Sequence, residues 1–193
     1  LRLRVRMAPA ISVLMPVRDA QGTVAAAIES VLAQTWTNWE LVIVDDGSQD
    51  GTAAILGQFA QNDARVVLIH TTPKGIAEAL QRGCEACRGE FIARMDADDV
   101  MDARRLELQR AFLAANRDVG FVSCRVRFGG TEAGYAAHVD WINSLVNHDE
   151  MSLRRFVEAP VAHPSVMFRR ELIQKHGGYR EGDFPEDYEL WLR

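Results

Sequence analysis

Three carboxylates lie within four residues directly after a short apolar segment. Residues 91–95 are apolar apart from Arg94, and Asp96, Asp98 and Asp99 follow them. Carboxylates this close together repel one another unless a cation lies among them. Oxygen ligands at this density suit a hard ion such as Mg2+ or Mn2+ rather than zinc, and an ion held there is well placed to neutralise a phosphate. We therefore predict a metal site at Asp98 and Asp96, with Asp96 reaching the metal or a ribose.

A second acidic pair, Glu186 and Asp187, precedes an apolar helical run near the end of the sequence. Helix capping would account for Glu186 alone. A carboxylate brought into the same cleft as the first cluster is instead able to deprotonate a hydroxyl, provided that burial and neighbours tune its pKa. The acids of the first cluster could instead lie at a helix N-terminus and complement the helix dipole, and we assign that role to Asp99 and Asp102.

Polar residues also follow the first two predicted strands. Arg18 and Asp19 come after the first strand, and Asp45 and Asp46 come after the second. In open α/β sheets, ligands bind outside the carboxyl ends of the strands, so these residues and the acidic cluster are expected to share one edge of the sheet. Asp45 is placed there to accept a hydrogen bond from a ribose hydroxyl or a base N–H.

Other polar residues near this edge have simpler explanations. Ser48 and Asp50 are expected only to cap the next helix. Lys74, Arg82 and Arg94 are able to meet phosphates, although scattered basic residues are usually solvated. The sequence has no G-x-G-x-x-G after the first strand and no G-x-x-x-x-G-K-[ST] motif, so a bound nucleotide must be held by the turn at 16–19, by Asp45 and by a metal.

Alternating apolar patterns predict the elements that position these residues. Four strands separated by three helices with short links imply an α/β fold whose central sheet is mostly parallel, with helices on both faces. The predicted strands are 11–15 (closed by Pro16), 40–44, 66–70 and 91–95, and the predicted helices are 22–34, 53–62 and 75–88.

The pattern is weaker after Asp102, but it suggests no second domain. Residues 1–10 are interpreted as an N-terminal extension with Met7 as the natural start, and 11–193 as one catalytic domain truncated at its C-terminus. The predicted elements are a helix at 106–116, a strand at 119–128, a loop at 129–134, weak helices at 139–146 and 153–157, a strand at 165–168, a helix at 171–176 ended by glycines, and the start of a helix at 185–193.

Composition excludes several classes of protein. The 193 residues are 48% hydrophobic and 25% charged, as in an ordinary soluble globular protein. The formal net charge of −5 argues against nucleic acid as the main partner. No apolar run approaches the ~20 residues of a membrane span, and the first residues lack the apolar segment of a signal peptide.

The cysteines, histidines and most tryptophans are expected to be structural. Cys84 and Cys87 form a C-x-x-C inside a helical pattern, where buried small apolar residues are expected rather than a redox or metal pair. His163 is expected at a strand entry, and Trp141 is expected to line an acceptor groove. Core positions are predicted for Trp36, Trp39 and Trp191, and surface positions for His138, His148 and His176.

Four segments in this order resemble the family 2 glycosyltransferases, which are inverting nucleotide-sugar transferases with the GT-A fold. The segments are ISVLMPVRDAQGTVAAAIESVLAQTW, ELVIVDDGSQDGT, KGIAEALQRGCEACRGEFIARMDADD and HPSVMFRRELIQKHGGYREGDFPEDYELWLR, and together they cover most of residues 11–193. The resemblance implies a GT-A, Rossmann-like sheet of mostly parallel strands flanked by helices.

The resemblance also implies roles for the matching residues. Asp96 and Asp98 look like the D-x-D motif that holds Mg2+ or Mn2+ on the diphosphate, and Asp187 looks like the general base that deprotonates the acceptor hydroxyl. The implied nucleotide-binding residues are Pro16, Val17, Arg18, Asp19, Asp45, Asp46, Lys74, Arg82 and Asp96, and the implied acceptor-side residues are Gly178, Tyr179 and Glu186.

The function implied by the resemblance is metal-dependent, inverting transfer of a single sugar to an acceptor hydroxyl. The donor would be a nucleotide-diphosphate sugar, with a UDP-sugar favoured. The acceptor would be a saccharide or a lipid-linked glycan in cell-surface polysaccharide synthesis. A cytoplasmic location, including peripheral association with the inner face of the membrane, fits this function and the reducing compartment that the cysteines suggest.

The sequence departs from the family pattern in two places. Residues 79–81 are Ala-Leu-Gln where many members have Ala-Arg-Asn, so a phosphate-side arginine is absent or replaced by Arg82. The Q-x-x-R-W motif of processive members is not found, which favours single transfer. Two alternatives stay open: a sugar-1-phosphate nucleotidyltransferase, for which PVRDAQG is a poor Gly-rich basic loop, and a non-catalytic nucleotide-sugar-binding protein.

Overall fold

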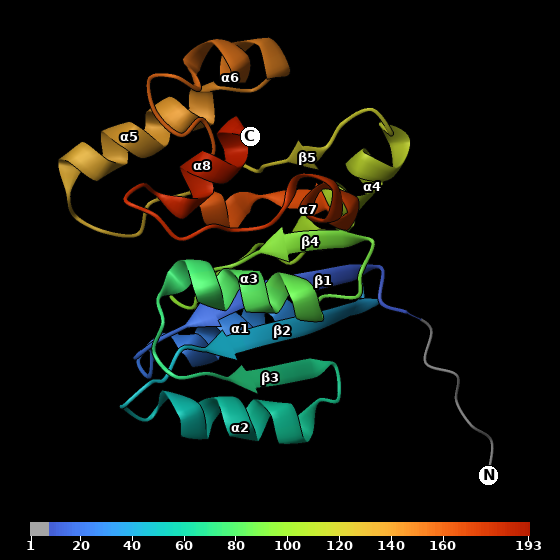
Figure 1. The fold of residues 1–193 in the computed structure, drawn as a ribbon, viewed down its shortest axis with the longest axis vertical. Coiled ribbons are helices and arrows are strands. Elements are labelled where there is room, and N and C mark those ends of the chain that lie inside the picture. The colour runs from blue at the N-terminus through green and yellow to red at the C-terminus, as the bar shows by residue number, and fades with distance from the viewer. Residues whose placement is uncertain (1–7) are drawn as a thin grey trace.

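A six-stranded sheet forms the centre of the protein (Figure 1), which is described here by a computed structural model over residues 8–193. The strand order is β3-β2-β1-β4-β6-β5, and β1 to β4 are parallel, whereas β6 runs antiparallel to both β4 and β5. The bounds are β1 Ile11–Val17, β2 Trp39–Asp45, β3 Val66–His70, β4 Phe91–Arg94, β5 Phe121–Val122 and β6 Met167–Arg169. The predicted α/β class with a mostly parallel sheet is confirmed.

Helices cover both faces of this sheet. Figure 1 shows α3 crossing one face, with α1 behind the sheet, and α5 and α6 lying beyond the β4 side. The helices are α1 Val24–Leu32, α2 Thr52–Asn62, α3 Ile76–Ala86, α4 Arg105–Ala115, α5 Ala133–Ser144, α6 His148–Arg154, α7 Arg170–His176 and α8 Glu186–Leu192, with a 3-10 turn η1 at His163–Ser165.

The core is divided by the sheet into two apolar clusters because successive side chains of a strand point to opposite faces. One cluster joins Val13 and Met15 of β1 to the buried faces of α1, α2 and α4. The other joins Leu14 and Ile92 to α3 and to residues of α7 and α8. The strands that carry the predicted site are therefore fixed by packing from both sides.

Strand β1 continues through Pro16, although the sequence predicted that Pro16 would close it. The pairing of β1 with β4 ends at Leu14 and Arg94, whereas its pairing with β2 continues to Val17. Leu14 faces β4, since its carbonyl accepts from the Met95 N–H. Pro16 faces the same way by the two-residue period, so its missing N–H lies where no neighbouring strand needs it.

A buried carboxylate ties the opposite end of the sheet together. Glu40 is 2% exposed, and it accepts from the Ser12 hydroxyl and from the Arg88 N–H and guanidinium. The next residue, Gly89, donates its N–H to the Ser12 Oγ at 2.8 Å. A Cβ on Gly89 would lie 2.5 Å from the Ser12 nitrogen, so glycine is required by this close approach of two backbones.

The second half of the chain differs from the sequence prediction. The strand predicted over 119–128 shrinks to the two residues of β5, because β6, its one partner within residues 8–193, is three residues long. Helix α5 begins at Ala133, inside the loop predicted over 129–134, and α6 begins at His148, well before the weak helix predicted over 153–157. Helix α7 ends at Gly177, which has the positive φ (84°) of a helix-ending glycine.

Other sequence predictions have mixed outcomes. Cys84 and Cys87 are buried as expected, and burial raises the pKa of the Cys87 thiol to about 12. No helix within residues 8–193 is both long enough and apolar enough to cross a membrane. The assignment of Met7 as the start concerns residues outside the described range, and the single truncated domain stays a prediction.

Candidate functional site

A cavity of about 720 Å3 opens at the carboxyl end of β4. Its walls come from the loop after β4, the segment around α5, the loop before η1 and the start of α8. The residues on which the site depends are Asp96, Asp98, Asp99, Glu158, His163 and Asp187. The acidic cluster after β4 and Asp187 of the second acidic pair, which are far apart in the sequence, therefore line one cavity.

The loop after β4 presents three carboxylates to this cavity. One oxygen from each of Asp96, Asp98 and Asp99 lies within 4.8 Å of the others. Burial raises the pKa of Asp99, and the charges of Asp96 and Asp98 raise it further. Three converging oxygen ligands are the donor set that Mg2+ and Mn2+ prefer, so these residues fit such an ion, and the structure adds Asp99 to the predicted pair.

A buried arginine contacts this cluster from inside the protein. Arg94 is 1% exposed, and its Nη1 lies 2.7 Å from Oδ1 of Asp96. Asp96 itself is half-buried, whereas Asp98 is exposed. The two acids of the D-x-D motif therefore have different surroundings, which their spacing in the sequence did not reveal.

Asp187 faces the cluster from the first turn of α8. Burial raises the pKa of its carboxyl group above the ordinary value, the backbone hydrogen bond from the Tyr188 N–H opposes this rise, and the charge of Glu158 adds to it. Helix α8 is held in place by the Tyr188 hydroxyl, which donates to the Arg155 carbonyl at 2.5 Å, and by Trp191, which packs on Phe121. A half-buried carboxylate with a raised pKa suits a proton acceptor.

His163 forms part of the cavity wall, although the sequence placed it only at a strand entry. Its Nε2 lies 2.8 Å from the Tyr179 hydroxyl, and its Nδ1 lies 3.8 Å from Oε1 of Glu186. Burial, followed by the charge of Arg94, holds the pKa of His163 well below its usual value, so the ring is neutral. The antiparallel pairing of β6 with β4 brings residues just before β6 to the carboxyl end of β4, and no local sequence pattern indicates that strand direction.

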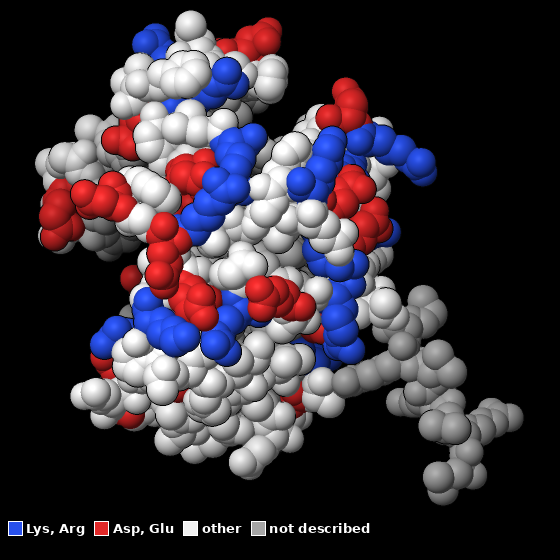
Figure 2. Space-filling view, viewed as in Figure 1, with Lys and Arg blue, Asp and Glu red and all other residues white. Residues whose placement is uncertain are grey.

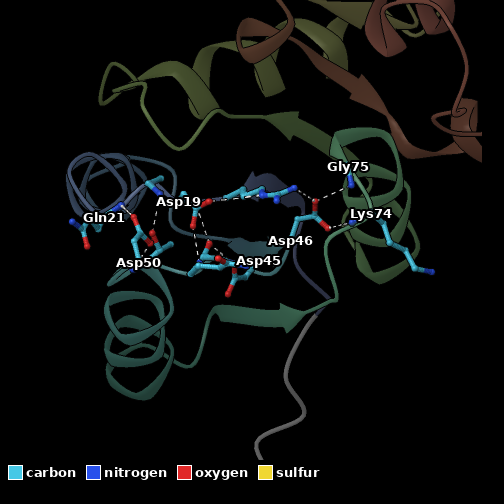
Figure 3. Close-up of polar contacts among 12 residues, drawn as sticks. Asp19, Gln21, Asp45, Asp46, Asp50, Lys74 and Gly75 are labelled. Carbon is cyan, nitrogen blue, oxygen red and sulfur yellow. Dashed lines mark hydrogen bonds and ion pairs between the residues drawn. The ribbon is translucent and has the colours of Figure 1, made fainter.

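The predicted nucleotide side lies at the carboxyl ends of β1 and β2, as Figure 3 shows. Asp45 is 2% exposed. Its Oδ1 accepts from the N–H and the hydroxyl of Ser48, and its Oδ2 lies 3.0 Å from Nδ1 of His70. The exposed His70 ring is thus fixed beside Asp45 at the edge of the sheet.

The turns after β1 and β2 are interlocked. Asp19, which has a φ of +48°, donates its N–H to Ser48 Oγ and accepts from the Gln49 N–H. Farther along, Asp50 accepts from the Gln21 N–H, and Gln21 Oε1 accepts from the Gly51 N–H (Figure 3). Ser48 therefore joins two turns and is not the helix cap predicted from the sequence.

Asp46 is used inside the protein, as a tie between β2 and α3. It is 4% exposed, and its carboxylate accepts from the backbone N–H groups of Lys74 and Gly75 (Figure 3) and from the Thr71 hydroxyl. Arg18 lies 3.8 Å from it. The carboxylate thereby closes the turn that leads into α3.

Several predicted residues do not line the cavity. Arg82 and Lys74 both pair with Glu78 on the surface of α3, and Tyr179 is buried behind His163. The nucleotide-side residues at the ends of β1 and β2, together with Gly178 and Glu186, lie outside the lining, as does Trp141, whereas His138, predicted at the surface, is half-buried within it. On the face shown in Figure 2, basic and acidic side chains are interspersed.

Comparison with known proteins identifies relatives along most of the chain. The family model described as "Glycosyl transferase family 2" matches residues 12–177. The EpsE protein of Bacillus subtilis (strain 168) is 34% identical over 96% of this chain and 66% of its own length. The O-antigen biosynthesis glycosyltransferase WbnJ of Escherichia coli is 31% identical over 99% of this chain and 74% of its own length.

A third relative carries a more specific name. The UDP-Glc:alpha-D-GlcNAc-diphosphoundecaprenol beta-1,3-glucosyltransferase WfgD of Escherichia coli is 38% identical, over 55% of this chain and 42% of its own length.

Solved structures share the fold at low sequence identity. A mannosyltransferase from Pyrobaculum calidifontis, in complex with GDP-Man and Mn2+, superposes with a TM-score of 0.72 at 22% identity, over 95% of this chain and 51% of that chain. S. aureus TarS 1-349 in complex with UDP-GlcNAc gives a TM-score of 0.73 at 17% identity, over 93% and 51% of the two chains. The chain thus spans about half the length of these structures.

Proposed function

The chain belongs to glycosyl transferase family 2, and from this membership we propose that it is a metal-dependent, inverting glycosyltransferase. It would move a single sugar from a nucleotide-diphosphate sugar to an acceptor hydroxyl. The observation that carries this proposal is the shared cavity, which is lined both by three carboxylates that fit a metal ion and by Asp187, whose pKa is raised.

The donor nucleotide is assigned to the edge formed by the turns after β1 and β2. The interlocked turns give this edge a fixed shape, and Asp45 with His70 offers polar groups beside it. Arg18 lies at the same edge and is half exposed. A UDP-sugar is favoured because WfgD is named for UDP-Glc and the TarS structure holds UDP-GlcNAc, with a GDP-sugar as the competitor from the Pyrobaculum calidifontis structure.

The metal is assigned to Asp98 with Asp96 and Asp99. These residues fit Mg2+ or Mn2+, and the Pyrobaculum calidifontis structure contains Mn2+. A bound divalent cation would neutralise charge on the diphosphate as it leaves.

Asp187 is assigned as the general base. Its carboxylate accepts the proton of the acceptor hydroxyl while the acceptor oxygen bonds to the anomeric carbon. The bond from that carbon to the phosphate oxygen breaks at the same time, and the electron pair leaves with the nucleoside diphosphate. Attack from the face opposite the leaving group inverts the anomeric carbon, and His163 and Glu158 would form the wall that orients the acceptor.

The biological setting is assigned to surface glycan synthesis. WbnJ is named for O-antigen biosynthesis and WfgD for a diphosphoundecaprenol-linked acceptor, which supports a saccharide or lipid-linked acceptor. Transfer of a single sugar, rather than polymerisation, is the reaction proposed.

Asp187→Asn is expected to lower sugar transfer by about 10^2- to 10^4-fold, because the amide cannot accept the proton. Donor binding should be retained, since the predicted nucleotide edge is untouched. The measurement is product formation from UDP-sugars with Mn2+, alongside the thermal shift caused by UDP and Mn2+. Asp183→Asn, an exposed acid in the preceding loop, is the matched control.

Transfer at the wild-type rate by Asp187→Asn would contradict the base assignment. Metal-dependent nucleotide binding without transfer or donor hydrolysis by the wild-type protein would instead support a non-catalytic binder.

A further inference from the structure

Arg94 is the largest fully buried side chain among residues 8–193. It is the last residue of β4, and its backbone is fixed from two sides. The Arg94 N–H donates to the Val166 carbonyl, and the Arg94 carbonyl accepts from Arg105. Because Arg94 and Ile92 share one face of β4, the side chain enters the apolar cluster formed with α3 and α8.

The guanidinium has few partners for a buried charge. Its Nη1 lies 2.7 Å from Oδ1 of Asp96, and this is the one ion pair that Arg94 forms within residues 8–193. Neither Nη1 nor Nε has an aligned hydrogen-bond partner in the described part of the chain. A buried charge is costly unless it is compensated, so Arg94 depends on Asp96 more than Asp96 depends on Arg94.

The charge of Arg94 also reaches both sides of the cavity. It lowers the pKa of Asp99 and of Asp187, and it lowers the pKa of His163. The other charged groups near this region are Asp98, Arg105, Arg127, Glu158 and Glu186.

We propose that Arg94 is a positioning residue that acts as an internal counter-ion: it holds Asp96 in place and divides the D-x-D motif into two roles. Asp96 is the partner of the buried arginine, and its orientation at the nucleotide diphosphate depends on that contact. Asp98, which is exposed and forms no ion pair with a basic residue in the described part of the chain, is left, together with Asp99, to bind the cation. The part of this inference that concerns donor binding rests on the proposed function.

The two acids then respond oppositely to neutralisation. Asp96→Asn leaves the buried guanidinium without its carboxylate, and Tm in EDTA is expected to fall by about 5 °C. Asp98→Asn, the matched control, only relieves repulsion among the acids, and Tm is expected to rise by about 1–2 °C. Adding Arg94→Met to Asp96→Asn removes the uncompensated charge and should recover at least half of the loss.

Donor affinity separates the two roles, because it would not depend on Arg94 if the contact with Asp96 only stabilised the fold. Arg94→Met is expected to raise the Kd for UDP with Mn2+ by about tenfold, while the Kd for Mn2+ alone changes less than threefold, because the loss concerns the orientation of Asp96. Arg94→Lys keeps the charge and should restore part of the affinity. Arg169→Met, which removes an arginine bound to three backbone carbonyls far from the acids, should lower Tm without changing either Kd.

A rise in Tm for Asp96→Asn equal to that for Asp98→Asn would overturn the counter-ion role, whatever the enzyme activity. Unchanged UDP affinity in Arg94→Met, with the melting results as expected, would overturn the positioning role and leave a structural pair. If the wild-type protein binds none of UDP, GDP, dTDP and CDP with Mn2+, the proposed function fails and the positioning role fails with it, while the melting series in EDTA still decides whether Arg94 and Asp96 act as a pair.

Discussion

Asp187 is the general base of the proposed reaction, and its surroundings shift its pKa in two directions. Burial raises the pKa, while the Tyr188 N–H and the charge of Arg94 lower it. A base with a raised pKa holds the transferred proton better, but it must still be ionised before the acceptor arrives. The rate of transfer therefore depends on how these opposing influences balance.

Transfer is expected to rise with pH as Asp187 loses its proton, and then to level off. Because the charge of Glu158 raises the pKa of Asp187, Glu158→Gln should move the acidic limb of the rate profile to lower pH. The measurement is kcat against pH for the wild type and Glu158→Gln, with Glu150→Gln, an exposed acid on α6, as the control. An unmoved limb would mean that another group controls it.

The same carboxyl group makes stability fall with rising pH, whereas the rate of transfer rises. Since the folded state raises its pKa, Asp187 contributes stability at low pH that is lost as the pH rises through the raised pKa. Asp187→Asn should therefore melt no lower than the wild type at pH 7, so that a loss of turnover in this variant is separable from unfolding.

At the scale of elements, the connection between α3 and β4 determines whether the site is assembled. Arg88 and Gly89 are bound to Ser12 and Glu40 at the start of β1 and β2. This contact sets the register of β4 against β1 and therefore the position of the acids that follow β4.

Gly89→Ala is expected to cost about 3 kcal/mol and to lower Tm by roughly 6–12 °C, because the added Cβ meets the Ser12 nitrogen at 2.5 Å and the Ile11 carbonyl carbon at 2.7 Å. Gly57→Ala in α2 is the matched control, since nothing lies within 4 Å of its added Cβ. A helix gains about 0.5–1 kcal/mol from that change, so its Tm should rise. A small effect of Gly89→Ala would show that the two backbones can separate easily.

Prediction from sequence succeeded where a local pattern and the final burial agreed. The apolar runs of β1 and β2 are buried along their whole length. The edge strand β3 is only partly buried, yet it spans Val66–His70 as predicted. Predictions failed where long-range pairing decides the structure. Residues 119–128 alternate like a strand, but only a short partner is available, and nothing local shows that β6 runs antiparallel to β4.

In the candidate site, too, local sequence patterns were informative and long-range contacts were missed. Asp96, Asp98 and Asp187 were predicted from residue type and order, and the shared cavity brings them together. The contact of Arg94 with Asp96 was missed because an arginine in a strand gives no local sign of burial. The wall position of His163 was missed because it depends on strand direction.

At the scale of the whole molecule, the cleft joins two parts of the chain. Residues before about 102 supply the predicted nucleotide edge and the acids, and residues after 126 supply the opposing wall and Asp187. Ligands that contact the first part are expected to stabilise the folded protein by mass action.

A screen of UDP, GDP, dTDP and CDP, each with Mn2+ or with EDTA, is expected to give a metal-dependent rise in Tm for one nucleotide. At a ligand concentration of 100 times Kd the gain is about 2.7 kcal/mol, or roughly 5–10 °C for a chain of this size. Asp98→Asn should lose the metal-dependent part. An equal shift in EDTA would remove the metal from the proposed mechanism.

The position of Asp187 on α8, the last helix of the described chain, has a consequence for biosynthesis. Translation delivers β1 to β4 and the acidic loop first, and α8 becomes available only after η1, β6 and α7 have been made. Domains tend to fold from the N-terminus as the ribosome releases them. Under the proposed function, the growing chain presents its donor side before it has its base, so the candidate site is complete only after α8 has been made.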